Sequence, residues 1–302
     1  MKKRQGPPIP FRELPLSNDF IFGEVMRREQ ICKLFLEALL GKQIARIEYI
    51  NKQQEMSDSF TNHGIRLDIY LRDENNTVYS VEMQTSGGVL IFKRIRYYQG
   101  MIDRHNLQKG EHYSELPESF IIVICTMDLF GRGLALYKRK VVMEGCEDIG
   151  YDDGSHIYFL NTDYTVENAA APIIEFLRCI RNNDIDPVGY SSQLMKEVCP
   201  VMAEVRGDAQ KEEAYMTWQT KIMDVKFWAK EEGREEGRKE GHEQGRKEGR
   251  EEGMEALVHA LRGLSQGRDM IVKELAKQFR LSLSDAAAAV DQYWTPESAP
   301  GV

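Results

Sequence analysis

The sequence lacks the long apolar runs and paired cysteines that mark two common protein classes. Its longest core-like apolar run is FIIVIC at 120–125, whereas a membrane span needs about 20 apolar residues. The first residues, MKKRQGPPIP, carry charges with no apolar segment behind them, so we expect no secretory signal. The five cysteines are widely spaced and form no CxxC pair, which argues against a disulfide framework or structural zinc. We expect a soluble cytoplasmic protein with free or buried thiols and no membrane segment.

Two further absences concern catalytic motifs and charge. None of the six histidines forms an HExxH or similar metal-binding pair, and no glycine-rich loop has the strand–loop–helix context of a nucleotide site. The net charge of −8 excludes a uniformly basic nucleic-acid coat but allows a local basic patch.

The 302 residues suit about two domains, and their patterns divide into successive segments. Residues 1–16 predict an irregular arm, 17–165 a mixed α/β domain, and 166–230 a helical extension. Within the first two hundred or so residues, helices are expected over 17–40, 89–105, 168–182 and 190–228, and strands over 44–50, 64–71, 77–84, 120–125 and 156–161.

Residues 231–253 form a charged repeat with glycine at every fourth position from 233 to 253. Each glycine inside a helix costs about 1 kcal/mol relative to alanine, and like-charged pairs such as Glu231–Glu235 oppose the favourable pair Glu235–Lys239. An isolated stable helix is therefore not expected. Two interpretations stay open: a flexible or semi-helical linker, or a self-association helix in which the glycine stripe brings two chains close together. The second predicts a homo-oligomer.

Residues 254–302 predict a small helical tail. Two apolar stripes at helical spacing are Leu257–Leu261–Leu264 and Ile271–Leu275–Phe279. Ser282 and Asp285 have the spacing of a capping box at the start of a last helix. The tail is either a plain helical bundle or a helix-turn-helix DNA reader.

The hairpin at 64–84 carries a candidate catalytic pair. If its turn centres near Asn75, Asp68 and Glu82 are equally far from the centre and face each other, with Cβ atoms about 5 Å apart. Gln84 lies two residues further along the same face. Paired carboxylates suit Mg²⁺, which prefers oxygen ligands and can lower the pKa of an attacking water. The alternative is a solvated sheet face with ordinary charges.

A family resemblance rests on several stretches: FIFGEVM at 20–26, ICKLFLEALLGKQIARIEYI at 31–50, GIRLDIYL at 64–71, VYSVEMQT at 78–85, KRIRYYQGMID at 93–103, GEHYSEL at 110–116, FIIVICTMDLFGRG at 120–133 and IYFLNT at 157–162. With the glycine repeat and the helical tail, they cover nearly the whole chain. Together they resemble the Rpn family of recombination-promoting nucleases, often labelled transposases, within the PD-(D/E)XK nuclease superfamily. The resemblance implies an α/β fold with a restriction-endonuclease-like core, in which helices flank a mixed central sheet, and a helical C-terminal extension. It also implies a DNA endonuclease that depends on Mg²⁺ or Mn²⁺.

The resemblance assigns roles to the hairpin residues. Asp68 matches the motif aspartate and Glu82 the motif glutamate, which hold the metal, and Gln84 stands where the superfamily pattern has lysine. An amide exchanges hydrogen bonds but brings no positive charge, so more of the catalysis falls to the metal. A weakly active or inactive DNA-binding or assembly module of the same fold is the alternative function.

The flanking helices supply further candidates. Asp19 is a candidate for an additional acid, with an N-cap role as the alternative, whereas Glu24 fits the family pattern less well. The candidate DNA-binding residues are Lys93, Arg94, Arg96 and Tyr98. Arg94 and Tyr98 share a helix face at i,i+4, and basic and aromatic residues together suit phosphate contact and base stacking. The alternative is a solvated basic face with tyrosines in the core.

Overall fold

The computed structural model describes residues 9–50, 55–56, 65–66, 68–88 and 90–294. Contacts divide the chain into two compact units, Met1–Thr217 and Trp218–Val302. Four parts of the expected elements lie outside the described residues: 1–8 of the arm, 64 and 67 of the strand expected over 64–71, 89 of the helix expected over 89–105, and 295–302 of the tail.

A six-stranded mixed sheet forms the centre of the first unit. Its order is β1 (Ile47–Tyr49), β4 (Ile69–Asp73), β5 (Val78–Gln84), β6 (Ser119–Cys125), β10 (Ser155–Asn161) and β7 (Leu136–Lys138). The neighbours β5, β6 and β10 run parallel, and the other pairs are antiparallel. Every residue of β5 and β6 is buried, as expected for strands covered on both faces.

Two short ribbons stand outside this sheet. They are β2 (Glu55–Met56) with β3 (Ile65–Arg66), and β8 (Val142–Met143) with β9 (Cys146–Gly150). The strand expected over 64–71 is therefore divided between β3 and β4. The sequence pattern also missed β2, β7 and β8, which are too short to give a readable period, and the five-residue strand β9.

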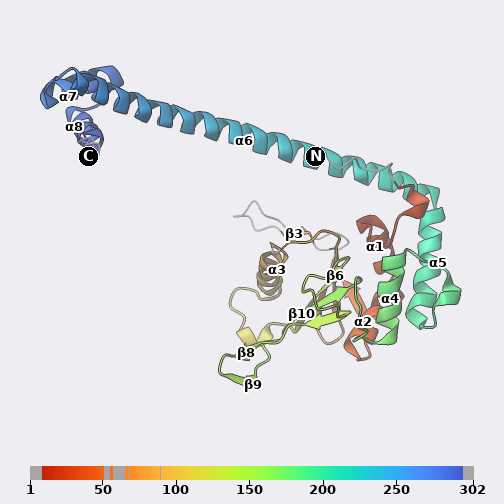
Figure 1. Ribbon diagram of the computed structural model, residues 1–302. Helices are drawn as coiled ribbons and strands as arrows, with labels where there is room; N and C mark the ends of the chain where they lie inside the picture. Colours follow the sequence, from red (N-terminus) through yellow and green to blue (C-terminus); the bar gives the residue numbers. More distant parts are fainter. Residues whose placement is uncertain (1–8, 51–54, 57–64, 67, 89, 295–302) are drawn as a thin grey trace. The chain divides into compact units, whose positions relative to one another are not determined.

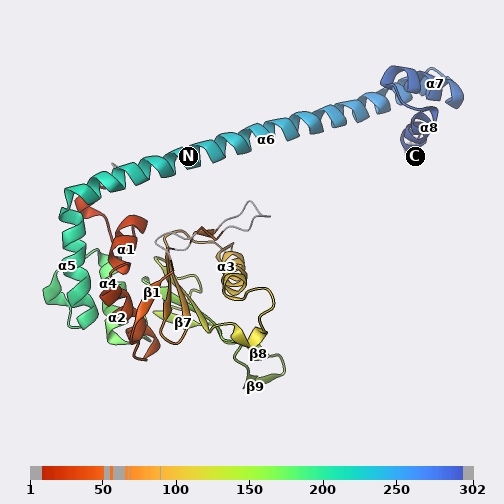
Figure 2. The same cartoon turned by 180° about the vertical axis from the view of Figure 1, so that it is seen from behind.

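Helices cover both faces of the central sheet (Figures 1 and 2). On one face, α3 (Leu90–Asn106) buries Ile91, Ile95 and Ile102 against β5, β6 and β10. The other face carries α1 (Asp19–Met26), α2 (Glu29–Leu40), α4 (Ala171–Asn182) and α5 (Gln193–Gly207). These helices pack tightly: the rings of Phe35 and Phe176 have centroids 5.1 Å apart. The expected α/β class, with helices flanking a mixed sheet, is confirmed.

Two of the expected helices are each divided by a cap. The helix expected over 17–40 is α1 followed by α2, because Arg27 ends α1 and extended backbone at Arg28 precedes α2. Asn18 caps α1: its Oδ1 accepts from the backbone N–H groups of Phe20 and Ile21 at 3.1 and 3.4 Å. The N-cap role considered for Asp19 therefore belongs to Asn18.

The helix expected over 190–228 is interrupted at Asp208. Its Oδ1 accepts from the backbone N–H groups of Gln210 and Lys211 at 2.7 and 3.3 Å, which starts the new helix α6 (Ala209–Gly263). Three short 3₁₀ turns complete the first unit: η1 (Phe11–Glu13), η2 (Tyr113–Glu115) and η3 (Pro187–Gly189).

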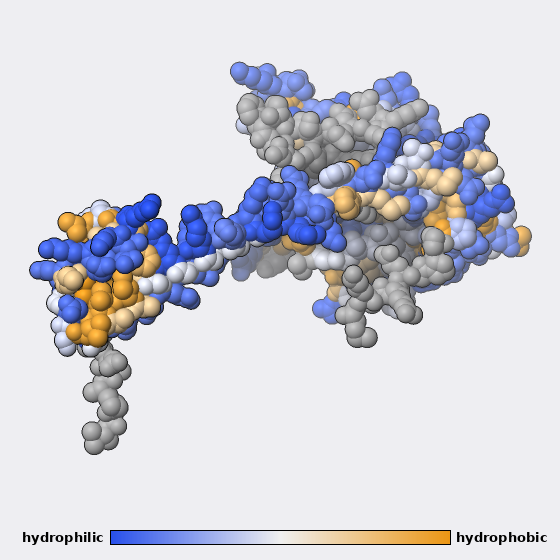
Figure 3. All heavy atoms as spheres, turned by 90° about the horizontal axis from the view of Figure 1, so that it is seen from above, coloured by the Kyte–Doolittle hydropathy of each residue, from blue (hydrophilic) through white to orange (hydrophobic). Residues whose placement is uncertain are grey.

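The glycine repeat is helical in the structure, which leaves open both the semi-helical linker and the self-association helix. Helix α6 runs through all of 231–253. The pairs Lys239–Glu235 at 3.3 Å and Lys247–Glu243 at 3.0 Å support it at i,i+4. Charged helix formers fill the positions between the glycines, so their propensity offsets part of the glycine cost. The charged surface of the repeat is blue in Figure 3.

The tail is a small bundle formed by the end of α6 with α7 (Arg268–Phe279) and α8 (Leu283–Tyr293), whose apolar side chains are orange in Figure 3. Its core is Val258, Ile271, Val272, Leu275, Ala286 and Val290. Leu264, expected in the apolar stripe, follows the end of α6 and is exposed. Ser282 caps α8, as expected, by accepting from the Asp285 N–H at 3.1 Å.

All five cysteines are free; four are buried and Cys146 is exposed. Within the described ranges, no helix combines the length and apolar character that crossing a bilayer requires.

Candidate active site

The structure brings Asp68 and Glu82 together. Strands β4 and β5 pair Ile69 with Val81, so the next position sets Asp68 opposite Glu82, as the hairpin spacing predicts. The backbone N–H of Asp68 donates to Glu82 Oε1 at 3.4 Å, and the backbone N–H of Met83 donates to Asp68 Oδ2 at 3.0 Å. These bonds across the hairpin hold both carboxylates at one place on the sheet.

The β5 side of the site is buried and Asp68 is partly exposed, which argues against the alternative of an ordinary solvated sheet face. Glu82 is 6% exposed and Gln84 is 7% exposed, while Ser80 is fully covered. Burial and the negative charge of Asp68 raise the pKa of Glu82 well above its usual range. The Ser80 hydroxyl, which donates to Glu82 Oε1 at 3.0 Å, opposes this shift only in part.

The donor set fits a hard divalent cation. Two carboxylates that repel each other in a buried site are stabilised when a cation binds between them, and Mg²⁺ needs only one or two protein carboxylates because it retains waters. Among the residues that the structure describes, no group of three or more His, Cys, Asp or Glu side chains gathers.

Gln84 is held from two sides. Its Nε2 donates to the Ser86 hydroxyl at 3.1 Å, and its Oε1 accepts a hydrogen bond from the guanidinium of Arg94 on α3. A positive charge thus reaches the position where glutamine replaces the motif lysine. Sequence reasoning missed this contact, because only the packing of α3 on the sheet brings the two side chains together. Ser80 shares the face of Glu82, as its period-two spacing predicts, but its hydrogen bond to Glu82 was not predicted.

Helix α3 turns its basic residues in different directions. The Arg94 guanidinium lies 5.8 Å from the centre of the Tyr98 ring, which confirms that they share a face. Burial and the charges of the two acids raise the pKa of Tyr98, so this face is turned toward the acidic pair. Lys93 is exposed, and Arg96 lines a cavity together with Gln99.

The acidic residues of α1 have a weaker connection to the site than those of the hairpin. Glu24 forms an ion pair with Lys211 of α6. Asp19 is the first residue of α1 and is exposed. Its role as a further acid stays a prediction.

Comparison with known proteins identifies the family. Residues 16–232 match the family model described as PD-(D/E)XK nuclease family transposase, and this match includes β4, β5 and α3. No curated protein and no solved structure matches the chain. The family match confirms the resemblance inferred from the motifs, and with the mixed sheet between helices it identifies a restriction-endonuclease-like core. Since the match covers more than half of the sequence, the chain belongs to the PD-(D/E)XK nuclease family transposases.

Proposed function

We propose that this protein is a metal-dependent DNA endonuclease that hydrolyses phosphodiester bonds and promotes recombination. The observation that carries the proposal is the pairing of the partly exposed Asp68 with the buried Glu82, held by hydrogen bonds across the hairpin. The family match supports DNA as the substrate. The free thiols support a cytoplasmic location.

Each residue of the site has a distinct role in this proposal. Asp68 and Glu82 would hold Mg²⁺ or Mn²⁺. Such an ion, when bound, polarises a phosphodiester and lowers the pKa of an attacking water. Gln84, fixed by Ser86 and Arg94, would orient that water. Arg94 would place positive charge beside the scissile phosphate, which supplies part of what the missing lysine would provide.

Other residues of α3 would bind the DNA strand. Lys93 and Arg96 are exposed and would neutralise phosphate charge. Tyr98 is only partly exposed beside Arg94, so it would contact DNA close to the acids.

We also infer that the repeat mediates self-association. A Cβ atom added at Gly237, Gly241 or Gly245 would meet nothing within 4 Å, so the chain's own packing does not require these glycines. A second copy of the helix would explain them, and a dimer would present two active sites to one duplex. Sedimentation at micromolar concentration is expected to give a dimer or larger species, and a monomer alone would contradict the inference.

A second candidate function is a DNA-binding or assembly module with negligible hydrolytic activity. The observation that favours it is the amide of Gln84 at the lysine position. Divalent metal binding that Asp68→Ala abolishes separates the two, since an assembly module does not need the ion.

The test is cleavage of supercoiled plasmid with Mg²⁺, Mn²⁺ or chelator. Wild type is compared with Asp68→Asn and Glu82→Gln, which keep side-chain size and remove charge. Nicking or linearisation that needs metal and is lost in both variants supports the nuclease. Equal activity in all three proteins contradicts the assignment of the site, and DNA binding without cleavage in any arm favours the assembly module.

A further inference from the structure

A cavity of about 720 Å³ lies beside α3 on a different flank from the acidic pair. The α3 residues that line it include Phe92, Arg96, Gln99 and Asp103, at helical spacings along one stripe, whereas Arg94 and Tyr98 form the stripe turned toward the acids. Its volume falls in the range of small-molecule sites. No role in the proposed reaction accounts for this cavity.

Aromatic rings form one wall. The centre of the Phe130 ring lies 4.6 Å from that of Tyr137, 5.1 Å from that of Phe159 and 5.8 Å from that of Phe92. Phe92 and Phe130 nevertheless remain 43% and 40% exposed. Asp128 fixes the Phe130 loop by accepting from the Phe130 N–H at 3.0 Å and the Tyr137 hydroxyl at 2.9 Å. Fixed and exposed rings are the platforms on which unpaired bases stack.

A polar group with an unused acceptor lies beside the aromatic wall. Gln99 Nε2 donates to Asp103 Oδ1 at 2.7 Å and to Ser119 Oγ at 2.9 Å. Its Oε1 is buried and has no hydrogen-bond partner. The carboxylate of Asp103 accepts only, so it fixes which end of the amide faces it. Gln99 also lines the cavity, so a small movement of its side chain on binding would present this oxygen to a ligand N–H group, and the amino groups of adenine, cytosine and guanine are such donors.

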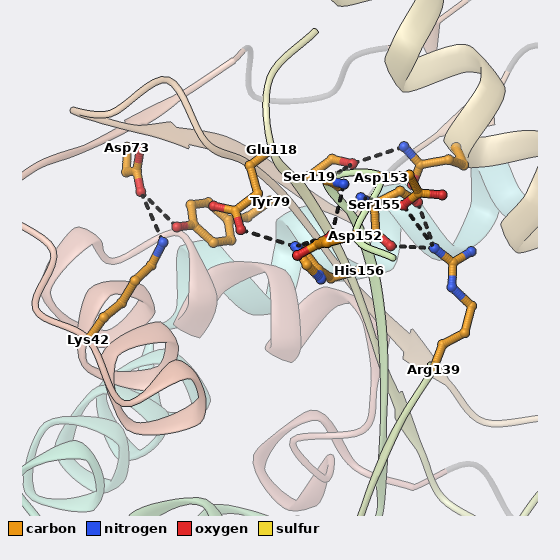
Figure 4. Close-up of polar contacts among 12 residues, drawn as sticks. Lys42, Asp73, Tyr79, Glu118, Ser119, Arg139, Asp152, Asp153, Ser155 and His156 are labelled. Carbon is orange, nitrogen blue, oxygen red and sulfur yellow. Dashed lines mark hydrogen bonds and ion pairs between the residues drawn. The ribbon is translucent and has the colours of Figure 1, made fainter. Parts of the chain in front are cut away.

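The charges around the cavity suit a nucleic-acid strand. Arg139 is turned back toward Ser155 and Asp153, so its charge is partly compensated (Figure 4). Arg96 and Lys138 also line the cavity. On α3, Arg94 lies on the flank that faces the acids, Arg96 lies on the flank that faces the cavity, and the exposed Lys93 lies between them. A helix with its side chains is about 10 Å across, so a strand lying over α3 can reach both flanks.

We propose that the cavity between Phe130 and Gln99 binds one unstacked base of the DNA strand whose phosphate lies at the acidic pair. The base stacks on Phe130, its amino group donates to Gln99 Oε1, and the basic residues of α3 hold the intervening backbone. This proposal rests on the proposed function for the choice of DNA as ligand.

The test is binding of short single-stranded oligonucleotides in chelator, measured by fluorescence anisotropy, so that no cleavage occurs. Each protein is titrated with a normal oligonucleotide and with an abasic one of equal length. Gly100→Leu fills the cavity at a helical position where an added Cβ meets nothing within 4 Å, so this variant should fold. Phe130→Ala removes the stacking wall. The matched controls are Gly207→Leu, also at a helical glycine in open space, and Tyr113→Ala, at an exposed aromatic residue.

Wild type and both controls are expected to prefer the normal oligonucleotide by roughly tenfold or more. Gly100→Leu and Phe130→Ala are expected to lose that preference and to keep wild-type binding of the abasic strand. No preference in wild type, or an unchanged preference in the two cavity variants, overturns the proposal. Binding of an apolar dye in the cavity without base preference also overturns it. Because binding is measured without metal, absence of plasmid cleavage bears on the proposed function and leaves this result intact.

Discussion

Glu82 on β5 and Glu175 on α4 are buried carboxylates of the same unit whose pKa values move in opposite directions. Burial and the charge of Asp68 raise the pKa of Glu82 well above its usual range. Burial also acts to raise the pKa of Glu175, but hydrogen bonds from Ser191 and Ser192 outweigh it and lower the pKa to about 2. Burial alone therefore does not decide the charge of a carboxylate; the donors around it do.

The two carboxylates differ in what balances their negative charge. Glu175 accepts from the Ser191 N–H at 3.0 Å, the Ser191 hydroxyl at 2.8 Å and the Ser192 N–H at 2.9 Å, so the chain itself satisfies its charge. These bonds tie α4 to the start of α5. Glu82 instead faces a second carboxylate across the hairpin. We interpret Glu175 as structural and Glu82 as a residue whose charge a bound cation completes.

The largest expected effect is on DNA cleavage, which should depend strongly on Glu82 and little on Glu175. Glu82→Gln should lower the rate of plasmid cleavage by about a thousandfold, because metal stabilisation of transition-state charge is worth several kcal/mol. Glu175→Gln should leave the rate within a few-fold when assayed at a temperature where the variant is folded. The two cleavage time courses, run at equal protein concentration, measure this. Equal losses of cleavage activity in both variants would contradict the different roles assigned to Glu82 and Glu175.

The next largest effect is on the free energy of unfolding, which the two substitutions should change in opposite directions. Without metal, Glu175→Gln should reduce the free energy of unfolding by about 2–3 kcal/mol, because charge-assisted hydrogen bonds that fix α5 are weakened. Glu82→Gln should raise it by about 1 kcal/mol, because a buried repulsion disappears. Urea denaturation at neutral pH with chelator measures both. A loss of stability in Glu82→Gln would show that its charge is already satisfied by the chain.

The contributions of Glu175 and Glu82 to stability should change with pH in opposite directions. The folded-state pKa of Glu175 is about 2 against an ordinary 4.5, so its stabilisation is present above 4.5 and lost as pH falls toward 2. Glu82 has a raised folded-state pKa, so its contribution is present below 4.5 and lost as pH rises through the raised value. Wild type and Glu175→Gln should therefore converge in stability as the solution is acidified. Urea midpoints measured across acid pH test this, and a constant difference would contradict it.

The smallest expected effect is on the stability of helix α6 and compares two glycines of the repeat. A Cβ at Gly253 would lie 3.3 Å from the Phe279 ring, whereas one at Gly241 would meet nothing within 4 Å. Gly241→Ala should stabilise α6 by up to about 1 kcal/mol and Gly253→Ala by less. Thermal unfolding followed by circular dichroism measures the difference. If the glycines mediate self-association, Gly241→Ala should also shift the sedimentation profile toward monomer.

The sequence predicted the pairing of the acids because that pairing depends on local geometry. The turn near Asn75 and the two-residue period of strands fix Asp68 opposite Glu82 without knowledge of the rest of the fold. Burial of Glu82 was not predictable in this way, since it depends on the parallel neighbour β6 and on the cover of α3. The Arg94–Gln84 contact likewise joins a helix to a strand end, and no local pattern encodes it.

Errors in the expected helices also have local physical causes. Asn18 and Asp19 are adjacent and both suit an N-cap, so composition alone could not choose between them. In the repeat, glycine at every fourth position opposes an isolated helix while the charged residues between the glycines favour a helix, so the sequence alone leaves its conformation open. The gaps between helices at Arg27–Arg28 and at Asp208 were not predicted from the sequence.

The measurement that tests the central claim most directly is calorimetric titration of Mn²⁺ into wild type, Glu82→Gln and Glu175→Gln at neutral pH. If a cation completes the Asp68–Glu82 pair, wild type and Glu175→Gln bind one ion saturably, and Glu82→Gln does not. Saturable binding of equal affinity in all three proteins, or no binding in wild type, would contradict the claim that this pair is a metal site.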